Sequence, residues 1–414
     1  MTRRGRLARF AWRAAALVLL ALACTPKRAA KPQHIEFWVY SPVAAVQPLV
    51  DRFETANPGI HVVLDQLDEQ AGNDRIANAV FNANEPPDLC ELPSRDVSHF
   101  MVRGALSDWS AGVADLRAGI RGWEMCMVGD AIYGLPWRLD TRALFYNKVL
   151  LASARLDSTS GPGTWAELRT AAARIERLPG GAHGYGLPAP DPSAVFEQFM
   201  PYGWGRGGEI LSVGLDSSRF DSPANRAALD LLVGLRPVSL LAQPESLDRE
   251  FVAGHLGFRL AGPALCARIA SAAPGLHYGV ALVPQPDRGT GTHASLARGR
   301  VLASFTTSRH KEDALKLARF LVEPEQALAL ARSLPDMLPV NLGVDTTADF
   351  RDRPAQRILF RQLETARFTP GHRDWPSLEA ILSTYVGDAL AGRHTVAEAM
   401  LAADTSIVRN LGPR

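Results

Sequence analysis

The amino-acid sequence predicts an α/β fold built as two lobes. Strand-like and helix-like segments alternate from residue 34 to residue 90 in the order β-α-β-α-β, which indicates parallel strands with helices on both faces of the sheet. The roughly 380 residues that follow the N-terminal segment exceed what one hydrophobic core usually supports. In addition, the polar and aromatic residues of the segment 130–148 suit a crossing between two lobes better than a closed core.

The first elements follow from the spacing of apolar residues and from the breaks between them. Ser41-Pro42 ends the first strand, and Asn57-Pro58-Gly59 ends the helix after it. We expect strands at 34–40, 60–64 and 86–90, with helices at 46–56 and 75–84 between them.

Ligands of parallel α/β sheets gather beyond the carboxyl ends of the strands, where the loops after the strands lie. In this sequence the rule selects Tyr40 and Ser41 after the first strand and residues 91–95 after the third.

The second part of the chain carries further local signals. Gly134-Leu135-Pro136 is expected to be a break, 139–146 a strand and Asn147-Lys148 a turn. Thr164 is a good N-cap residue, and Glu167 completes a capping box at the start of a helix. We expect another β-α unit from a strand at 301–305 and an amphipathic helix at 311–321.

The N-terminus has the features of a secretory signal. Basic residues up to Arg13 precede the apolar stretch 14–23, which is too short to span a bilayer. The sequence Leu20-Ala-Leu-Ala-Cys24 looks like a lipobox, so we expect a signal peptide at 1–23, lipidation of Cys24 and a tether at 24–32. Ordinary signal cleavage nearby is the alternative.

Composition excludes several classes of function. A net charge of +2 gives no electrostatic case for nucleic-acid binding. Cys90, Cys126 and Cys266 allow one disulfide and a free thiol or three buried thiols, and their spacing offers no metal site. No nucleophile elbow, metal-binding helix motif or glycine-rich phosphate loop supports an enzyme.

Several short motifs occur in one order along the chain. They include Tyr133-Gly-Leu-Pro136 with Asp140-Thr141 and Tyr146-Asn-Lys148, then Gly207-Gly208-Glu209, Leu338-Pro-Val-Asn341 and Thr395-Val396 with Glu398-Ala399. Together they resemble the family 1 extracellular solute-binding proteins, the group of the maltose-binding protein, from about residue 34 to the C-terminus.

The resemblance implies a two-lobed periplasmic-binding-protein fold of type II, with a mainly parallel sheet in each lobe and a hinge of several crossings. Lobe 1 would hold 33–139 and 284–335, and lobe 2 would hold 140–283 and 336–414. The crossings would lie near 138–140, 277–283 and 334–341.

The function implied is that of a receptor, not an enzyme. It would capture a solute, with a carbohydrate or sugar derivative favoured, and deliver it to the permease of an ABC importer. The resemblance implies a monomer at the periplasm or cell surface, held to the membrane by lipidated Cys24, without cofactor or metal. A ligand-sensing or structural lipoprotein that is not coupled to transport is the alternative.

Candidate ligand contacts lie on both lobes. From lobe 1 and the hinge we expect contacts from aromatic and charged side chains, although Glu91 has Arg95 and Asp140 has Arg142 as possible ion-pair partners instead. These candidates are Tyr40, Glu91, Trp137, Arg138 and Asp140.

From lobe 2 we expect Trp204, in a glycine-rich aromatic loop at 202–206, and Trp375, near a helix start. Relatives commonly carry a Trp after Gly262-Pro263, where this chain has Ala264. Arg300 departs from the glycine pair of relatives, so it would bind a carboxylate or phosphate from the cleft or, with Arg298, flank a turn. These departures argue against a maltodextrin as the solute.

Overall fold

The computed structural model describes residues 33–412 except 84, 190, 370 and 373. The predicted signal peptide, the tether and Cys24 lie outside these residues. None of the helices in the described part combines the length and apolar character needed to cross a bilayer.

One sheet has seven strands in the order β13-β6-β12-β3-β1-β2, with β14 beside β12. β1 pairs in parallel with both β2 and β3, as the β-α-β-α-β pattern predicted, whereas β12 runs antiparallel to β3 and β6. The strands are β1 (Gln33–Val39), β2 (Ile60–Gln66), β3 (Leu89–Pro93), β6 (Leu135–Thr141), β12 (Ser295–Ala303), β13 (Leu338–Pro339) and β14 (Ala366–Phe368).

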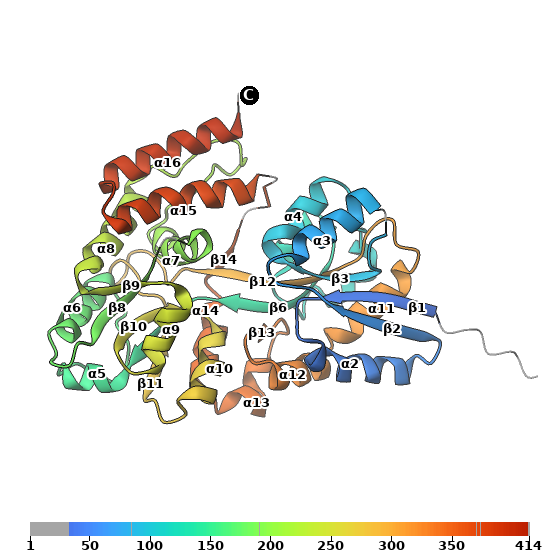
Figure 1. The fold of residues 1–414 in the computed structure, drawn as a ribbon, viewed down its shortest axis with the longest axis horizontal. Coiled ribbons are helices and arrows are strands. Elements are labelled where there is room, and N and C mark those ends of the chain that lie inside the picture. Colours follow the sequence, from blue (N-terminus) through green and yellow to red (C-terminus); the bar gives the residue numbers. More distant parts are fainter. Residues whose placement is uncertain (1–32, 84, 190, 370, 373, 413–414) are drawn as a thin grey trace, which may run out of the picture.

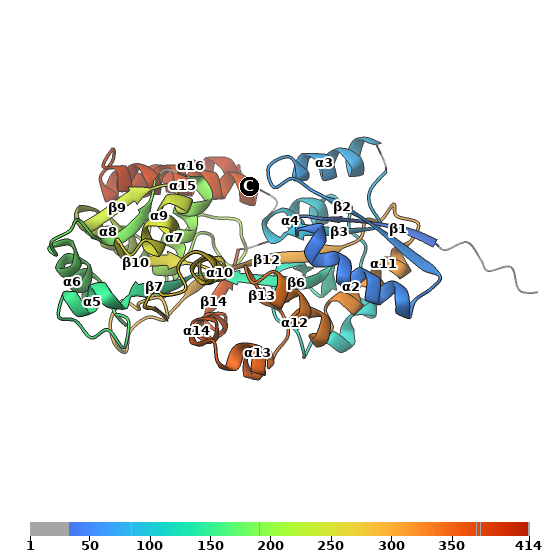
Figure 2. The same cartoon turned by 60° about the horizontal axis from the view of Figure 1, so that its bottom comes forward.

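Helices cover both faces of this sheet, and Figure 2 shows α3 and α2 on opposite sides of β1 and β2. Helix α11 spans the residues predicted for it, with its buried side chains on one face. The helices are α2 (Val43–Ala56), α3 (Gly72–Asn78) followed by a π-helical turn (Ala79–Ala83), α4 (Ser94–Val102), α11 (Lys311–Leu321) and α12 (Pro324–Ser333).

The second sheet has five strands in the order β11-β7-β10-β8-β9. β8 is parallel to both β9 and β10, and β7 is antiparallel to β10 and β11. The strands are β7 (Ala143–Asn147), β8 (His183–Pro188), β9 (Ser239–Ala242), β10 (Leu256–Ala261) and β11 (Tyr278–Ala281). A separate hairpin pairs β4 (Met127–Val128) with β5 (Ala131–Ile132).

The remaining helices lie mainly around this second sheet (Figure 1). The predicted capping box at Thr164 and Glu167 is confirmed at the start of α6. The helices are α5 (Lys148–Ser153), α6 (Trp165–Glu176), α7 (Pro192–Gly205), α8 (Pro223–Leu235), α9 (Pro244–Val252), α10 (Pro263–Ala272), α13 (Ala348–Arg351), α14 (Pro354–Gln362), α15 (Trp375–Ala391) and α16 (Val396–Leu411).

The chain passes from the first sheet to the second at Arg142, between β6 and β7, and returns between β11 and β12. Figure 1 shows β6 and β12 lying between the two groups of helices. β13 and β14 pair within the seven-stranded sheet, although the sequence assigned them to lobe 2. The predicted limits of the lobes stay a prediction.

Three local predictions are wrong. Leu135 and Pro136 do not break the chain but open β6, where a proline is tolerated because it lies at the start of the strand and next to a β-bulge opposite Arg300 and Val301. The predicted strand 139–146 is two strands that meet at Arg142. Asn147 caps α5 by accepting hydrogen bonds from Val149 N and Leu150 N instead of opening a turn.

The segment 202–206 is not a loop, because its first four residues form the last turn of α7 and Arg206 is the C-cap residue. Packing against α8 outweighs the low helix propensity of its glycines, since a Cβ on Gly203 would lie 2.8 Å from Asn225 Oδ1. Likewise, Arg298 and Arg300 do not flank a turn but lie within β12.

Candidate functional site

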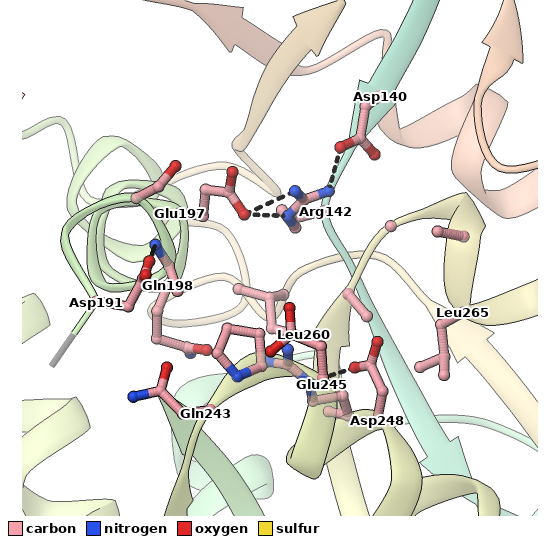
Figure 3. A pocket seen from close by; sticks show the side chains of 17 residues that line it. Asp140, Arg142, Asp191, Glu197, Gln198, Gln243, Glu245, Asp248, Leu260 and Leu265 are labelled. Carbon is pink, nitrogen blue, oxygen red and sulfur yellow. Dashed lines mark hydrogen bonds and ion pairs between the residues drawn. The ribbon is translucent and has the colours of Figure 1, made fainter. Parts of the chain in front are cut away.

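A cavity of about 310 Å³ lies at the carboxyl ends of the parallel strands β8, β9 and β10. The loops after these strands lead into α7, α9 and α10, so the N-termini of three helices face the cavity. Figure 3 shows the lining side chains converging from these loops and from the β6–β7 crossing. The charged and amide side chains that line it are Asp140, Arg142, Asp191, Glu197, Gln198, Gln243, Glu245, Asp248 and Arg259.

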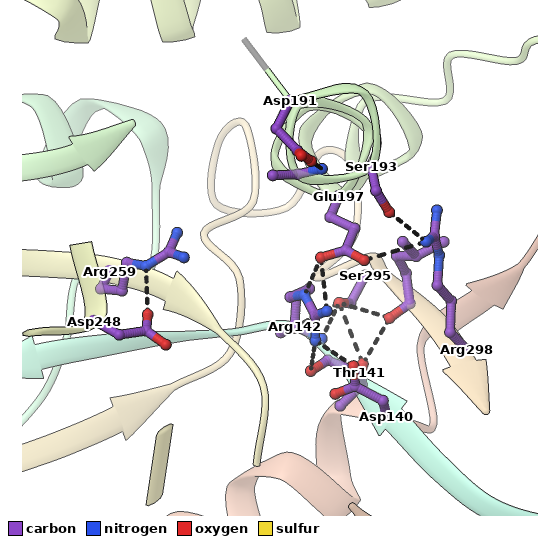
Figure 4. A network of polar contacts seen from close by, with 12 residues as sticks. Asp140, Thr141, Arg142, Asp191, Ser193, Glu197, Asp248, Arg259, Ser295 and Arg298 are labelled. Atoms are coloured by element: carbon purple, nitrogen blue, oxygen red, sulfur yellow. Dashed lines mark hydrogen bonds and ion pairs between the residues drawn. The ribbon is translucent and has the colours of Figure 1, made fainter. Parts of the chain in front are cut away.

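Glu197, which lines the cavity, forms ion pairs with both Arg142 at the β6–β7 crossing and Arg298 on β12. Arg142 donates to Asp140 Oδ2 at 2.6 Å and to Glu197 Oε2 at 3.0 Å from Nε and 2.6 Å from Nη2. The other oxygen of Glu197 lies 3.2 Å from Nη1 of Arg298, and Nη2 of Arg298 donates to Glu379 Oε1 at 2.6 Å. Figure 4 shows Glu197 between the two guanidinium groups. Charges therefore alternate along a chain of five side chains from β6, the crossing, α7, β12 and α15.

Burial and ion pairing act in opposite directions on these carboxyl groups. Burial raises the pKa of Asp140, and the Arg142 guanidinium offsets this only in part. Burial also acts to raise the pKa of Glu197, but Arg142 and Arg298 outweigh it and hold that pKa below its usual value. Glu197 is therefore the firmly ionised centre of the network.

Three further polar contacts hold the wall of the cavity that β10, α9 and α7 form. Arg259, on β10, donates through Nε to Asp248 Oδ1 of α9 at 3.1 Å. Gln198 donates through Nε2 to the Tyr185 hydroxyl at 2.7 Å, and that hydroxyl lies 2.8 Å from the hydroxyl of Tyr202. The wall is thus held in place by polar contacts and presents charged and amide groups to the cavity.

A second polar cluster lies at the carboxyl ends of β1 and β3. Glu91 is fully buried and accepts hydrogen bonds from Ser41 N at 2.7 Å and Ser41 Oγ at 3.0 Å. Arg138 donates to the same hydroxyl at 3.1 Å and pairs with Asp336. Arg300 Nε lies 3.7 Å from Glu91 Oε1. The guanidinium carbon of Arg300 lies 5.0 Å from the centre of the Tyr40 ring.

Comparison with known proteins shows which family the chain belongs to. Residues 40–328 match the model of the bacterial extracellular solute-binding proteins. The chain belongs to this family.

Solved structures that resemble this solute-binding protein include two binding proteins from other bacteria. The sugar-binding protein MalE of Xanthomonas citri is 25% identical, with a TM-score of 0.82 over 92% of this chain and 97% of that one. A solute-binding protein of Thermotoga lettingae, solved with α-D-tagatose, is 25% identical, with a TM-score of 0.78 over 92% of this chain and all of that one.

Two relatives known from sequence match most of this solute-binding protein. A binding protein of Brucella abortus, whose name gives no solute, is 26% identical over 82% of this chain and 83% of its own length. An uncharacterized lipoprotein of Streptomyces antibioticus is 26% identical over 77% of this chain and 73% of its own. The two solved structures confirm the two-lobed binding-protein fold predicted from the sequence. The prediction of a mainly parallel sheet in each lobe is wrong, because both sheets also contain antiparallel pairs.

The structure brings together four of the predicted contact residues and separates the rest. Tyr40, Glu91, Arg138 and Arg300 form the cluster at β1 and β3, whereas Asp140 lines the cavity. Whether any of them contacts a solute stays a prediction.

The three predicted tryptophans are packed against their neighbours. Trp137 is 1% exposed, with its ring centre 6.1 Å from that of Phe37. Trp375 is 1% exposed and donates to Glu379 Oε2 at 3.1 Å. Trp204 is 4% exposed and lies beneath Arg367, at the end of α7 opposite the cavity, so its ring is buried although glycines flank it in the sequence. Trp204 lines a separate cavity together with Arg367, and Trp375 lines a small one together with Ser94. Contact of the three tryptophans with a solute stays a prediction.

Sequence reasoning missed several residues of the cavity. The rule that selected Tyr40 also applies to β8 and β10, and it would have selected Asp191 and Gly262 had those strands been identified. Glu197 and Asp248 sit inside helices, where no local motif distinguishes them from solvent-exposed carboxylates.

The three cysteines that the chain retains after Cys24 are buried free thiols. Cys90, Cys126 and Cys266 form no disulfide in the structure, which matches the second of the two possibilities that the sequence left open. Burial raises the pKa of each thiol, so none is an activated nucleophile.

Proposed function

We propose that this chain is an extracytoplasmic lipoprotein that captures a carbohydrate or sugar derivative between its lobes and delivers it to an ABC importer. The observation that carries the proposal is the cavity at the ends of β8, β9 and β10, which lies where α/β sheets bind ligands. Its dense set of carboxylate, amide and guanidinium groups suits the hydroxyl groups of a sugar. Cys24 would be lipidated and would hold the protein to the membrane.

The cluster at β1 and β3 would form the opposing wall of the cleft. It follows from the same rule, because Ser41 and Glu91 lie at the carboxyl ends of parallel strands. The proposed solute would contact Asp140, Arg259 and Gln198 on one side, with Tyr40, Glu91, Arg138 and Arg300 on the other. A solute that touches both walls favours the closed arrangement of the lobes, which the permease would recognise.

The test is thermal unfolding of the mature protein, from Lys31 onward, with a panel of mono- and oligosaccharides, polyols and sugar phosphates. A solute at 100 times its dissociation constant that binds only the native state stabilises it by about 2.7 kcal/mol. Arg259→Gln should abolish this shift, because it removes the charged group of β10 from the cavity. Arg319→Gln should retain it, since Arg319 pairs with Asp115 on an exposed surface.

Uptake separates transport from the alternative. Deletion of the gene should stop uptake of the solute that stabilises the protein. Uptake that continues unchanged would point to a ligand-sensing lipoprotein, and no stabilisation by any solute would contradict the receptor proposal itself.

A further inference from the structure

The cavity holds buried hydrogen-bond acceptors that lack partners. Gln198 is 2% exposed, and its Oε1 atom has no hydrogen-bond partner among the described residues. Asp140 Oδ1 also lacks a hydrogen-bond partner among the described residues, whereas Oδ2 of the same carboxylate accepts a hydrogen bond from Arg142. Leaving a buried acceptor without a donor is costly, so both atoms are matched best by a solute that donates hydrogen bonds.

The cations around the cavity already have carboxylate partners. Arg142 is bonded to Asp140 and Glu197, and Arg259 to Asp248. Arg298, behind Glu197, is bonded to Glu379 as well. An anionic solute would have to approach each of these guanidinium groups beside the carboxylate that it already binds, and it would therefore be repelled by carboxylates of the protein.

The side chains that line the cavity carry a surplus of negative charge. Five are carboxylates and two are guanidinium groups. The three helix N-termini together supply about 1.5 positive charges at most. Two of them already have their own carboxylate, since Asp191 caps α7 and Glu245 lies in the first turn of α9.

We propose that the solute is a sugar or polyol that carries a positively charged amino group, and that the cavity rejects sugars bearing phosphate or carboxylate. The ammonium group lies against Asp140, and a hydroxyl of the same solute donates to Gln198. An ammonium offers three donors and a charge that offsets the surplus, whereas a neutral hydroxyl offers one donor. This deepens the proposed function and rests on it, because it takes the same cavity as the site.

The experiment compares ring-matched sets of sugars that differ in one group. Titration calorimetry of the mature protein uses glucose, galactose and mannose, each with its 2-amino-2-deoxy and 6-phosphate derivatives, and maltotriose with the deacetylated trimer of glucosamine. The best-bound set should show the amino member binding about tenfold more tightly than the neutral one, the ratio expected when a charge-assisted hydrogen bond replaces a neutral one. Its phosphate should bind more weakly than both.

Asp140→Asn tests the assignment of the amino group. The variant keeps the shape and removes the charge, so the affinity for the amino member should fall more than that for the neutral member, and the preference should drop below about threefold. Asp115→Asn, at an exposed ion pair remote from the cavity, should keep the full preference. If Asp140→Asn fails to fold, Glu245→Gln at the exposed mouth of the cavity should reduce the preference in part.

The outcomes separate this proposal from the receptor function. If the solute that binds most tightly is neutral or anionic, the amino-group proposal is overturned, but the proposed receptor function still holds. Equal loss of both members in Asp140→Asn also overturns it, because the residue would then only hold the structure. No binding by any solute overturns the receptor and the amino-group proposal together.

Discussion

At the scale of single residues, Glu197 holds the candidate site together. Its carboxylate binds both Arg142 and Arg298, and these two arginines come from the crossing and from β12. The other polar groups of the cavity could not have been predicted as a set. The network joins Asp140 and Glu379, which lie far apart in the sequence, so only the tertiary fold brings them together. By contrast, Tyr40 and Glu91 could be selected, because the strands that precede them are evident from the sequence.

Replacing Glu197 should destabilise the protein strongly. Glu197→Ala leaves two largely buried guanidinium groups without their shared partner, and breaking such a pair costs about 3 kcal/mol. Glu364→Ala, an exposed side chain, should change the free energy of unfolding by less than about 0.5 kcal/mol. Urea denaturation measures both. A loss of stability for Glu197→Ala no larger than that of the control would contradict the role given to the network.

Asp157 should titrate well below other aspartates. Hydrogen bonds from the side chains of Ser160 and Thr159 and from Thr159 N lower its pKa to about 2. Since the pKa is lower in the folded state than in the unfolded one, Asp157 contributes stability above its unfolded pKa and loses it as pH falls toward 2. Carbon-13 NMR of the side-chain carboxyl group should show this value in the native protein, and Thr159→Ala should raise it. An ordinary value near 3.8 would rule out the three-donor loop.

At the scale of elements, local signals sufficed where a helix carries its own caps and an amphipathic face. Helix α11 and the capping box of α6 were predicted from such signals. The last turn of α7 was missed because its glycines and Pro201 disfavour a helix locally, and packing against α8 and α15 decides the conformation. The division of 139–146 into β6 and β7 was missed because the apolar run is continuous although the strands belong to different sheets.

Replacing a glycine by alanine should change the stability of the protein in opposite directions at two positions on neighbouring helices. In α7, Gly203→Ala brings a methyl group within 2.8 Å of the buried Asn225 Oδ1 and should destabilise the protein. In α8, nothing lies within 4 Å of the methyl group of Gly234→Ala, which should therefore stabilise by about 0.5–1 kcal/mol through helix propensity. Thermal unfolding of both variants checks the pair. Equal responses would mean that 202–206 is not packed as a helix against Asn225.

At the scale of the whole molecule, two sheets are joined by strands that run between them. β6 and β12 pair along their length, and Arg142 and Arg298 attach this pair to α7 and α15 through ion pairs. The length of the chain and the β-α alternation were enough to predict two lobes. The position of the cavity was not, since it depends on which strand ends face the other lobe.

Binding of the solute should make the molecule more compact. A solute held by both walls favours the closed arrangement, so small-angle X-ray scattering should show a smaller radius of gyration with the solute than without it. Arg259→Gln should abolish the change at the same solute concentration. An unchanged radius of gyration at saturation would show that binding does not close the lobes.

The most direct measurement is a crystal structure of the mature protein with the solute that stabilises it most. The proposed site predicts that the solute lies at the carboxyl ends of β8, β9 and β10, within hydrogen-bond distance of Asp140, Gln198 and Arg259. A solute bound instead beside Trp204 at the far end of α7, or only on the surface of one lobe, would contradict the proposed site.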